Sequence, residues 1–177
     1  MPSASASATI APGGFGIPSN PDADTLFLVR DECQSSRDGY RLEFPEDWWT
    51  NTDIGKVPSC SWFSPTFYEV PDPDVVPDEI AIEIFVVNGD RGYQRRVLSR
   101  EEIIIGGTQS GWRLEIDGTA DGSDGGSYEY VVQLGPTLEQ GPNLVARTDT
   151  KMGGIFDVNR GVLDRIMATM RFFGTVQ

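Results

Sequence analysis

The clearest periodic pattern in the chain lies near its C-terminus, between Asp157 and Phe173. Apolar residues recur there at spacings of three and four, the period of an α-helix with one buried face. They are Val158, Val162, Leu163, Ile166, Met167 and Met170. The charged residues that fall on the opposite side are Arg160, Asp164, Arg165 and Arg171. The pattern predicts one amphipathic helix, capped by Asp157, that covers a sheet.

Most of the remaining pattern is typical of β-strands. Residues 40–44 alternate between apolar and charged, as in a strand with one buried face, and Pro45 ends the run. Residues 80–87 are β-branched and almost continuously apolar, so we expect a central strand with helical cover on both sides of the sheet. The other segments expected as strands are 26–29, 60–63, 103–105, 111–116, 128–134 and 144–149. A capping-box pattern at Ser99 and Glu102 favours a short helix at 93–102.

These elements predict an α+β fold in which a mostly antiparallel sheet is flanked by helices and the C-terminal helix packs on the sheet. The last three strands are separated by Gly-rich loops, which favours antiparallel neighbours. A chain of 177 residues suits one domain, expected at 25–177. Residues 1–24 are rich in Ser, Ala, Pro and Gly and are expected to form a flexible tether. Their composition is similar to the spacer that follows a signal or lipid-anchor site in exported bacterial proteins.

Charge and composition narrow the functional classes. The net charge is −13 and the pI is about 4.3, which disfavours nucleic acid and anionic membrane surfaces as partners. The chain contains no histidine, so it holds no Ser-His-Asp triad, Cys-His pair or His-ligated zinc. No catalytic motif is evident, and we expect a protein that is not an enzyme. Catalysis by paired carboxylates, as in a hydrolase, is the alternative that this composition leaves open.

The two cysteines, Cys33 and Cys60, have no metal-ligand spacing around them. They form either a disulfide or two buried thiols. We favour the disulfide because the tether-like N-terminus is typical of an exported protein.

The segment from Asp117 to Gly126 places carboxylates among glycines, as oxygen-only calcium sites do. Asp117, Asp121 and Asp124 are therefore candidate calcium ligands. The segment lacks EF-hand spacing, however, and a solvated hairpin loop explains the same residues. With an exposed tryptophan, a calcium site would make the protein a calcium-dependent carbohydrate-binding module.

Two other features are candidates for a ligand or partner surface. Residues 71–79 form an acidic, proline-rich loop in which Asp72, Asp74 and Asp78 could contact a cation or a basic partner. Trp48 and Trp49 are adjacent, so at most one of them can easily point inward, and the other could stack on a ligand.

Three short motifs together resemble the PsbP-like family. They are Tyr40-Arg-Leu-Glu-Phe-Pro-Glu-Asp-Trp48, the turn Ile105-Gly-Gly with the following strand Trp112-Arg-Leu-Glu115, and Val162-Leu-Asp-Arg-Ile-Met-Ala-Thr-Met-Arg-Phe172. The resemblance implies an α/β/α sandwich and a non-enzymatic domain that docks on other proteins. Members include an extrinsic photosystem II subunit and bacterial surface lipoproteins, and they share no catalytic residues. The two cysteines and the acidic loop depart from the family pattern.

The leading hypothesis is a non-catalytic binding or docking domain outside the cytoplasm, of the bacterial lipoprotein type. Its partner would be a protein or a small ligand, and a lipid tether could lie upstream of residue 1. The sequence contains no transmembrane segment. The alternatives are the carboxylate-dependent hydrolase and the calcium-dependent carbohydrate-binding module.

Overall fold

The structure is a computed structural model that describes residues 9–10, 15–89, 96–117 and 125–173. In chain order its elements are β1 (Thr9–Ile10), β2 (Gly16–Ile17), α1 (Pro21–Leu26), β3 (Arg30–Ser35), β4 (Tyr40–Pro45), β5 (Trp49–Thr50), β6 (Trp62–Ser64), β7 (Ile82–Asn88), β8 (Val97–Ile105), β9 (Gln109–Ile116), β10 (Ser127–Gln133), β11 (Pro142–Asp149), α2 (Phe156–Thr169) and β12 (Arg171–Phe172).

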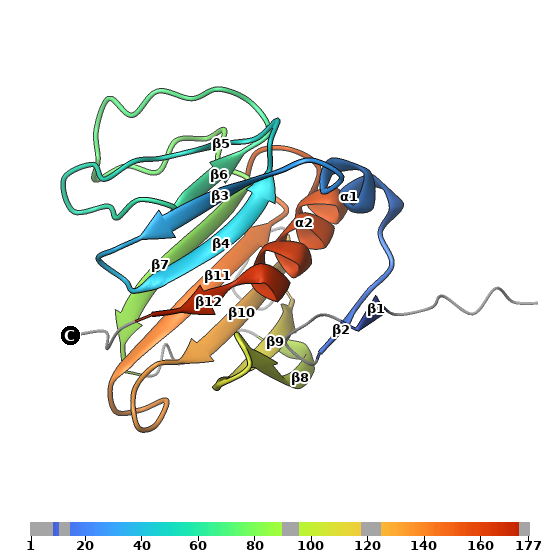
Figure 1. The fold of residues 1–177 in the computed structure, drawn as a ribbon, viewed down its shortest axis with the longest axis vertical. Coiled ribbons are helices and arrows are strands. Elements are labelled where there is room, and N and C mark those ends of the chain that lie inside the picture. Colours follow the sequence, from blue (N-terminus) through green and yellow to red (C-terminus); the bar gives the residue numbers. More distant parts are fainter. Residues whose placement is uncertain (1–8, 11–14, 90–95, 118–124, 174–177) are drawn as a thin grey trace, which may run out of the picture.

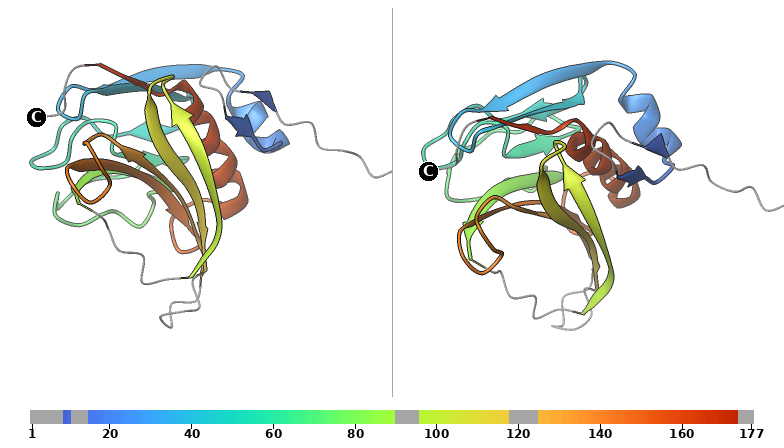
Figure 2. Two further views of the ribbon diagram at one scale, coloured as in Figure 1. Left: turned by 90° about the horizontal axis from the view of Figure 1, so that it is seen from below. Right: turned by 60° about the horizontal axis from the view of Figure 1, so that its bottom comes forward.

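The elements form two layers (Figure 1). One layer is a seven-stranded antiparallel sheet in the order β5-β6-β7-β11-β10-β9-β8. The other contains α1, α2 and a three-stranded sheet in the order β12-β4-β3. The right-hand view of Figure 2 shows this second layer above the strands of the large sheet. α2 contacts both β4 and β11, so it joins the two layers around the main core. The predicted α+β class, with a C-terminal helix packed on a mostly antiparallel sheet, is confirmed.

The predicted C-terminal helix is present as α2, and its apolar stripe lies in the core. Val162, Leu163, Ile166 and Met167 are fully buried, and Val158 packs against the same cluster. The helix ends at Thr169, earlier than predicted, because the chain then becomes extended and pairs with β4 as β12. Its N-cap is Ile155 rather than Asp157.

Two of the charged residues opposite the apolar stripe of α2 are buried. Asp164 is 3% exposed and Arg165 is 8% exposed, because other parts of the chain cover that side. Arg165 forms an ion pair with Asp24 of α1, which packs on α2. Gly161 allows this close approach, since a Cβ at its position would lie 2.8 Å from the Cβ of Ala23.

The expected central strand is β7, which lies inside the sheet between β6 and β11. The expectation that both of its faces are covered by helices is wrong for the described residues. α1 and α2 contact each other and lie on the same side of the sheet. Ile82 and Ile84 point into the main core beneath them. Glu83 and Phe85 are on the other face, where Arg147 forms an ion pair with Glu83 and lies over the ring of Phe85.

Several local predictions also need correction. Residues 97–102 belong to strand β8 rather than to a helix, because the turn at Gly106 and Gly107 pairs them with β9. Both glycines have positive φ angles, 62° and 79°, which suit a tight hairpin. Residues 26–29 do not form a strand: α1 ends at Leu26, and Leu28 is exposed.

Part of the expected tether belongs to the fold. Phe15 and Ala23 are buried, and α1 begins at Pro21. Asn20 caps α1 through its Oδ1, which accepts a hydrogen bond from the backbone N–H of Ala23, and its Nδ2 donates to the carbonyl of Asp157 in α2. Residues 15–24 are therefore packed on the C-terminal helix.

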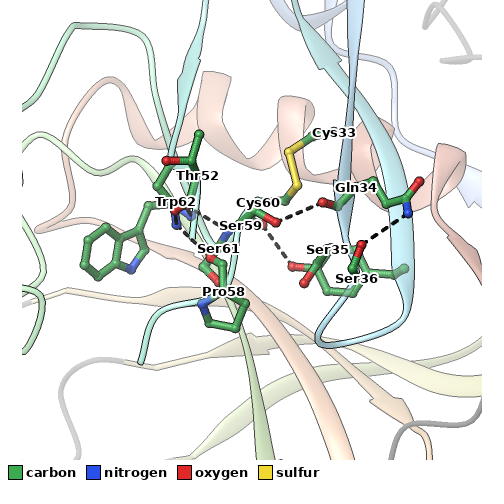
Figure 3. The surroundings of a disulfide bond; sticks show 12 residues. Cys33, Gln34, Ser35, Ser36, Thr52, Pro58, Ser59, Cys60, Ser61 and Trp62 are labelled. Carbon is green, nitrogen blue, oxygen red and sulfur yellow. Dashed lines mark hydrogen bonds between the residues drawn. A yellow bond between two sulfur atoms is a disulfide. The ribbon is translucent and has the colours of Figure 1, made fainter. Parts of the chain in front are cut away.

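The predicted disulfide joins Cys33 of β3 to Cys60, which immediately precedes Ser61 and β6 (Figure 3). Cys60 is fully buried and has a φ angle of 64°. Its carbonyl accepts a hydrogen bond from the buried hydroxyl of Tyr40. A structural disulfide fits an oxidising environment outside the cytoplasm. No helix in the described residues has the length and apolar character needed to cross a membrane.

Candidate functional site: an exposed aromatic and acidic face

The two adjacent tryptophans lie in opposite environments. Trp48 is 6% exposed and belongs to the main core, whereas Trp49, the first residue of β5, is 49% exposed. Successive side chains of an extended segment point in opposite directions, so burial of one leaves the other outside. Of these two tryptophans, Trp49 is therefore the one that can contact a ligand or partner.

Trp49 does not stand alone on the surface. The ring of Phe67 contacts it edge-on, with 5.1 Å between the ring centroids, and Phe67 is itself 60% exposed. Edge-to-face contacts between aromatic rings are favourable, by about 0.5–1.5 kcal/mol beyond the area they bury. The contact holds two large apolar rings in place at the surface.

An open pocket of about 580 Å³ adjoins Phe67. Its apolar lining is Phe67, Tyr68, Pro71, Val75 and Pro77, and its charged lining is Glu69, Asp72 and Glu79. All the charged groups among these described residues are carboxylates. We call Trp49 together with the residues lining this pocket the aromatic–acidic face. Its charge suits a cationic group, and its rings suit an apolar one.

The proline-rich loop that forms this face is fixed at both ends. A small hydrophobic cluster of Trp62, Tyr68 and Ile80 lies beneath it. The Tyr68 hydroxyl donates a hydrogen bond to the carbonyl of Trp62, and burial raises the pKa of Tyr68 well above its usual value. The Ser64 hydroxyl donates to the carbonyl of Glu79 at 2.8 Å. The face is therefore already formed in the free protein.

The structure brings only part of the predicted partner surface together. Trp49 contacts Phe67, which lines the pocket with Asp72. Asp74 lines a separate pocket, and Asp78 is exposed without lining either. Trp48 is in the core, as stated above. Phe67 is a further residue of this surface that the sequence pattern did not predict; its neighbour Tyr68 is buried, and the adjacent pair Phe67-Tyr68 carries the same signal as the pair Trp48-Trp49.

The predicted calcium site lies mostly outside the described residues. Asp121 and Asp124 are in the segment 118–124, and Asp117 is the only one of the three that the structure describes. The backbone N–H of Asp117 donates to the carbonyl of Arg96. Within the described ranges, no three carboxylate or cysteine side chains are grouped so that they could hold a metal ion. Calcium binding by these residues remains a prediction.

A buried polar network surrounds Asp164 of α2. One carboxylate oxygen of Asp164 accepts hydrogen bonds from the hydroxyls of Tyr128 and Tyr130, each at 2.6 Å. Arg113 lies 3.8 Å from the same oxygen. Burial raises the pKa of Asp164, while the two tyrosines and the nearby arginines lower it in part.

The N-terminal segment closes this network. Arg113 donates a hydrogen bond to the carbonyl of Gly16, and the buried ring of Phe15 packs against Tyr130 with 6.0 Å between centroids. Asp164 itself is 3% exposed. The network therefore fixes the N-terminal segment and α2 on the sheet.

The hydrolase hypothesis requires two carboxylates with raised pKa values in one cleft. Burial also raises the pKa of Asp38, in the turn between β3 and β4, with Arg37 opposing the shift. Asp38 lines a pocket of about 440 Å³, whereas Asp164 is enclosed in the network on α2. The two groups are thus on separate elements, and they do not form the carboxylate pair that this chemistry needs.

Comparison with known proteins gives no assignment, because no family model and no curated protein matches the chain.

Proposed function

We propose that this protein is a non-catalytic docking domain outside the cytoplasm that binds a partner protein through the aromatic–acidic face. The observation that carries the proposal is the exposed pair of Trp49 and Phe67 beside a pocket whose charged lining is entirely carboxylate. Large aromatic side chains often contribute most of the binding free energy at protein interfaces. The preformed loop reduces the entropy that binding must overcome.

The chemistry of the face defines the partner segment. It should carry Arg or Lys to meet Glu69, Asp72 and Glu79, and an apolar side chain to cover the two rings. The net charge of −13 also attracts a basic partner at long range, so association should slow as salt increases.

The disulfide and the N-terminal composition support the proposed compartment. A disulfide is stable under oxidising conditions, and residues 1–14 keep the Ser-, Ala-, Pro- and Gly-rich character of a spacer. Together with the resemblance to PsbP-like lipoproteins, these features support a bacterial cell-surface or secreted protein, tethered by a lipid anchor upstream.

The test is a selection of short peptides from a random displayed library on the immobilised full chain. We expect enrichment of peptides that combine Arg or Lys with an apolar residue, and weaker binding of the selected peptides to Trp49→Ser and Phe67→Ser. Leu28→Ser is the matched control, since Leu28 is 79% exposed and lies between α1 and β3, outside the face. Enrichment of acidic peptides, or equal binding to all variants, would overturn the proposal.

The exposure of Trp49 also favours carbohydrate binding, because sugar rings stack on exposed tryptophan. A glycan array probed with and without a calcium chelator separates this function from protein docking. Binding to a glycan that is lost in Trp49→Ser and with chelator would establish the carbohydrate-binding module instead.

A further inference from the structure

The face of the large sheet that points away from the helices carries a hydrophobic cluster of its own. Leu114, Ile116 and Val131 are buried there, and Trp112 and Leu138 pack against them. These residues are separate from the main core on the other side of the sheet. Helix packing does not explain this second cluster, because α1 and α2 both cover the opposite face of the sheet (Figure 1).

Strand pairing places two neighbouring rows of side chains across this outer face. Val131 of β10 pairs with Trp112 of β9 on one side and with Val145 of β11 on the other. Arg100 of the edge strand β8 pairs with Leu114 of β9. Directly opposed residues in a sheet point to the same face, so these side chains form a continuous, mainly apolar floor.

The loop at 134–141 forms a fixed wall beside this floor. Asn143 is buried, and its Nδ2 donates hydrogen bonds to the carbonyls of Leu138 and Gly89. At the base of the loop, Gly135 and Gly141 are so close that a Cβ on Gly135 would lie 2.7 Å from the Cα of Gly141. The wall is therefore rigid and in place before any ligand arrives.

Between the floor and the wall is a pocket of about 360 Å³. This volume is within the range of small-molecule sites, about 300–1,000 Å³. Val87, Val97, Leu114, Val131 and Val145 give it an apolar lining, and Arg100 and Glu139 are its only charged lining residues in the described part of the chain. Few polar groups around an apolar cavity are the usual pattern of a ligand site.

Arg100 is the cationic group of this pocket and can pair with an anionic head group. The guanidinium carbon of Arg100 lies over the indole of Trp112, 4.8 Å from the ring centroid, a cation–π contact that holds the charged group beside the pocket. The buried Nε1 of Trp112 and Oδ1 of Asn143 have no hydrogen-bond partner among the described residues. Unpaired buried polar atoms are uncommon in folded proteins, and the first of these is a further donor on the sheet side of the pocket, beside Arg100.

We infer that this pocket binds a small amphipathic carboxylate, whose apolar body fills the cavity and whose carboxylate pairs with Arg100. The site lies between β7, β8 and the 134–141 loop, so it does not depend on the aromatic–acidic face proposed above. The Glu139 carboxylate repels the ligand carboxylate, whereas Arg100 attracts it. Removing the charge of Glu139 should therefore raise the affinity for the ligand, and removing the charge of Arg100 should lower it.

Isothermal titration calorimetry, in which straight-chain carboxylates are added to the full chain and their affinities are measured, tests the inference. Each added CH₂ group should raise the affinity about fourfold until the pocket is full, so octanoate should bind roughly fifteenfold more tightly than hexanoate. Octanol, which has the same tail without the charge, should bind more weakly than octanoate. Trp49→Ser should bind octanoate like the wild type, because that residue belongs to the other face.

Two charge variants and one steric variant complete the test. Arg100→Gln should weaken octanoate binding at least tenfold and leave octanol binding unchanged, since it removes a charge-assisted hydrogen bond. Glu139→Gln should strengthen octanoate binding. Val97→Trp, at a position 38% exposed on the edge strand, should fill the pocket and block both ligands without disturbing the main core.

Circular dichroism of each variant checks that it is folded. Equal affinity of octanoate and octanol, equal octanoate affinity of Arg100→Gln and wild type, or no binding of any chain length would each overturn the inference.

Discussion

Loss of the Cys33–Cys60 disulfide should destabilise the domain by several kilocalories per mole. The bond joins residues separated by 27 positions. The loop-closure entropy that a cross-link of this length removes from the unfolded chain corresponds to about 3.6 kcal/mol at 25 °C. For a domain of this size, that loss lowers the melting temperature by about 7–14 °C. The perturbation is the double substitution Cys33→Ala/Cys60→Ala.

A second variant separates the cross-link from the backbone conformation at Cys60. Its φ of 64° is unfavourable for any residue with a Cβ, so alanine retains this cost while glycine removes it. Cys33→Ala/Cys60→Gly should therefore be more stable than the double-alanine variant by about 1 kcal/mol. Both should remain less stable than the disulfide-bonded wild type.

The assay is urea unfolding followed by tryptophan fluorescence, with and without reductant. Reduced wild type should match Cys33→Ala/Cys60→Ala, and both should show a larger m-value than oxidised wild type, because an unfolded chain without the cross-link exposes more surface. An unchanged unfolding midpoint, or a loss below about 1 kcal/mol, would refute the loop-entropy reasoning.

The remaining predictions concern single residues. Met167→Asp places a charge in the fully buried core and should unfold the domain, which near-ultraviolet circular dichroism would show; a folded variant would mean that α2 faces a partner. Trp48→Ala should cost about 3–5 kcal/mol in chemical unfolding, whereas Trp49→Ala should cost about 1 kcal/mol or less. Burial raises the pKa of Asp38 in the folded protein. The protonated side chain therefore contributes to stability when the pH is below the ordinary pKa of aspartate, and this contribution is lost as the pH rises through the pKa of the folded state. Asp38→Asn should therefore melt at the same temperature as wild type near pH 3 and at a higher temperature at pH 7; an equal difference at both pH values would contradict this.

Some of this protein could be predicted because local pattern and tertiary environment agree. The stripe through Val162, Ile166 and Met167 recurs at the helical period, and the core requires one apolar side of that helix. β4 alternates visibly because one of its faces is solvated. The composition of the N-terminal segment favours the disulfide, and the fold brings the Cα atoms of Cys33 and Cys60 to 5.9 Å, a normal spacing for such a bond.

Other features depend on contacts between distant segments. Asp164 and Arg165 have the charged character of a solvent-facing helix side, yet α1 and the N-terminal segment bury them. β3 is formed by the polar run Arg30–Ser35, which is a strand because β4 supplies its hydrogen-bond partners. Residues 97–102 contain a helix-capping pattern, but pairing with β9 makes them part of a strand.

The candidate sites also combine features that local sequence predicts with features that depend on tertiary contacts. The adjacent positions of Trp48 and Trp49 required that one face outward, and the composition of residues 71–79 made their loop acidic. Sequence alone did not determine that Phe67 lies against Trp49, because their contact spans 18 positions and depends on how the loop is anchored. Likewise, Arg100, Trp112 and Glu139 are far apart in the chain and line one pocket only through strand register and the fixed 134–141 loop. Periodicity and composition reflect local and solvent preferences, whereas a site is made by the long-range pairing that only the tertiary structure decides.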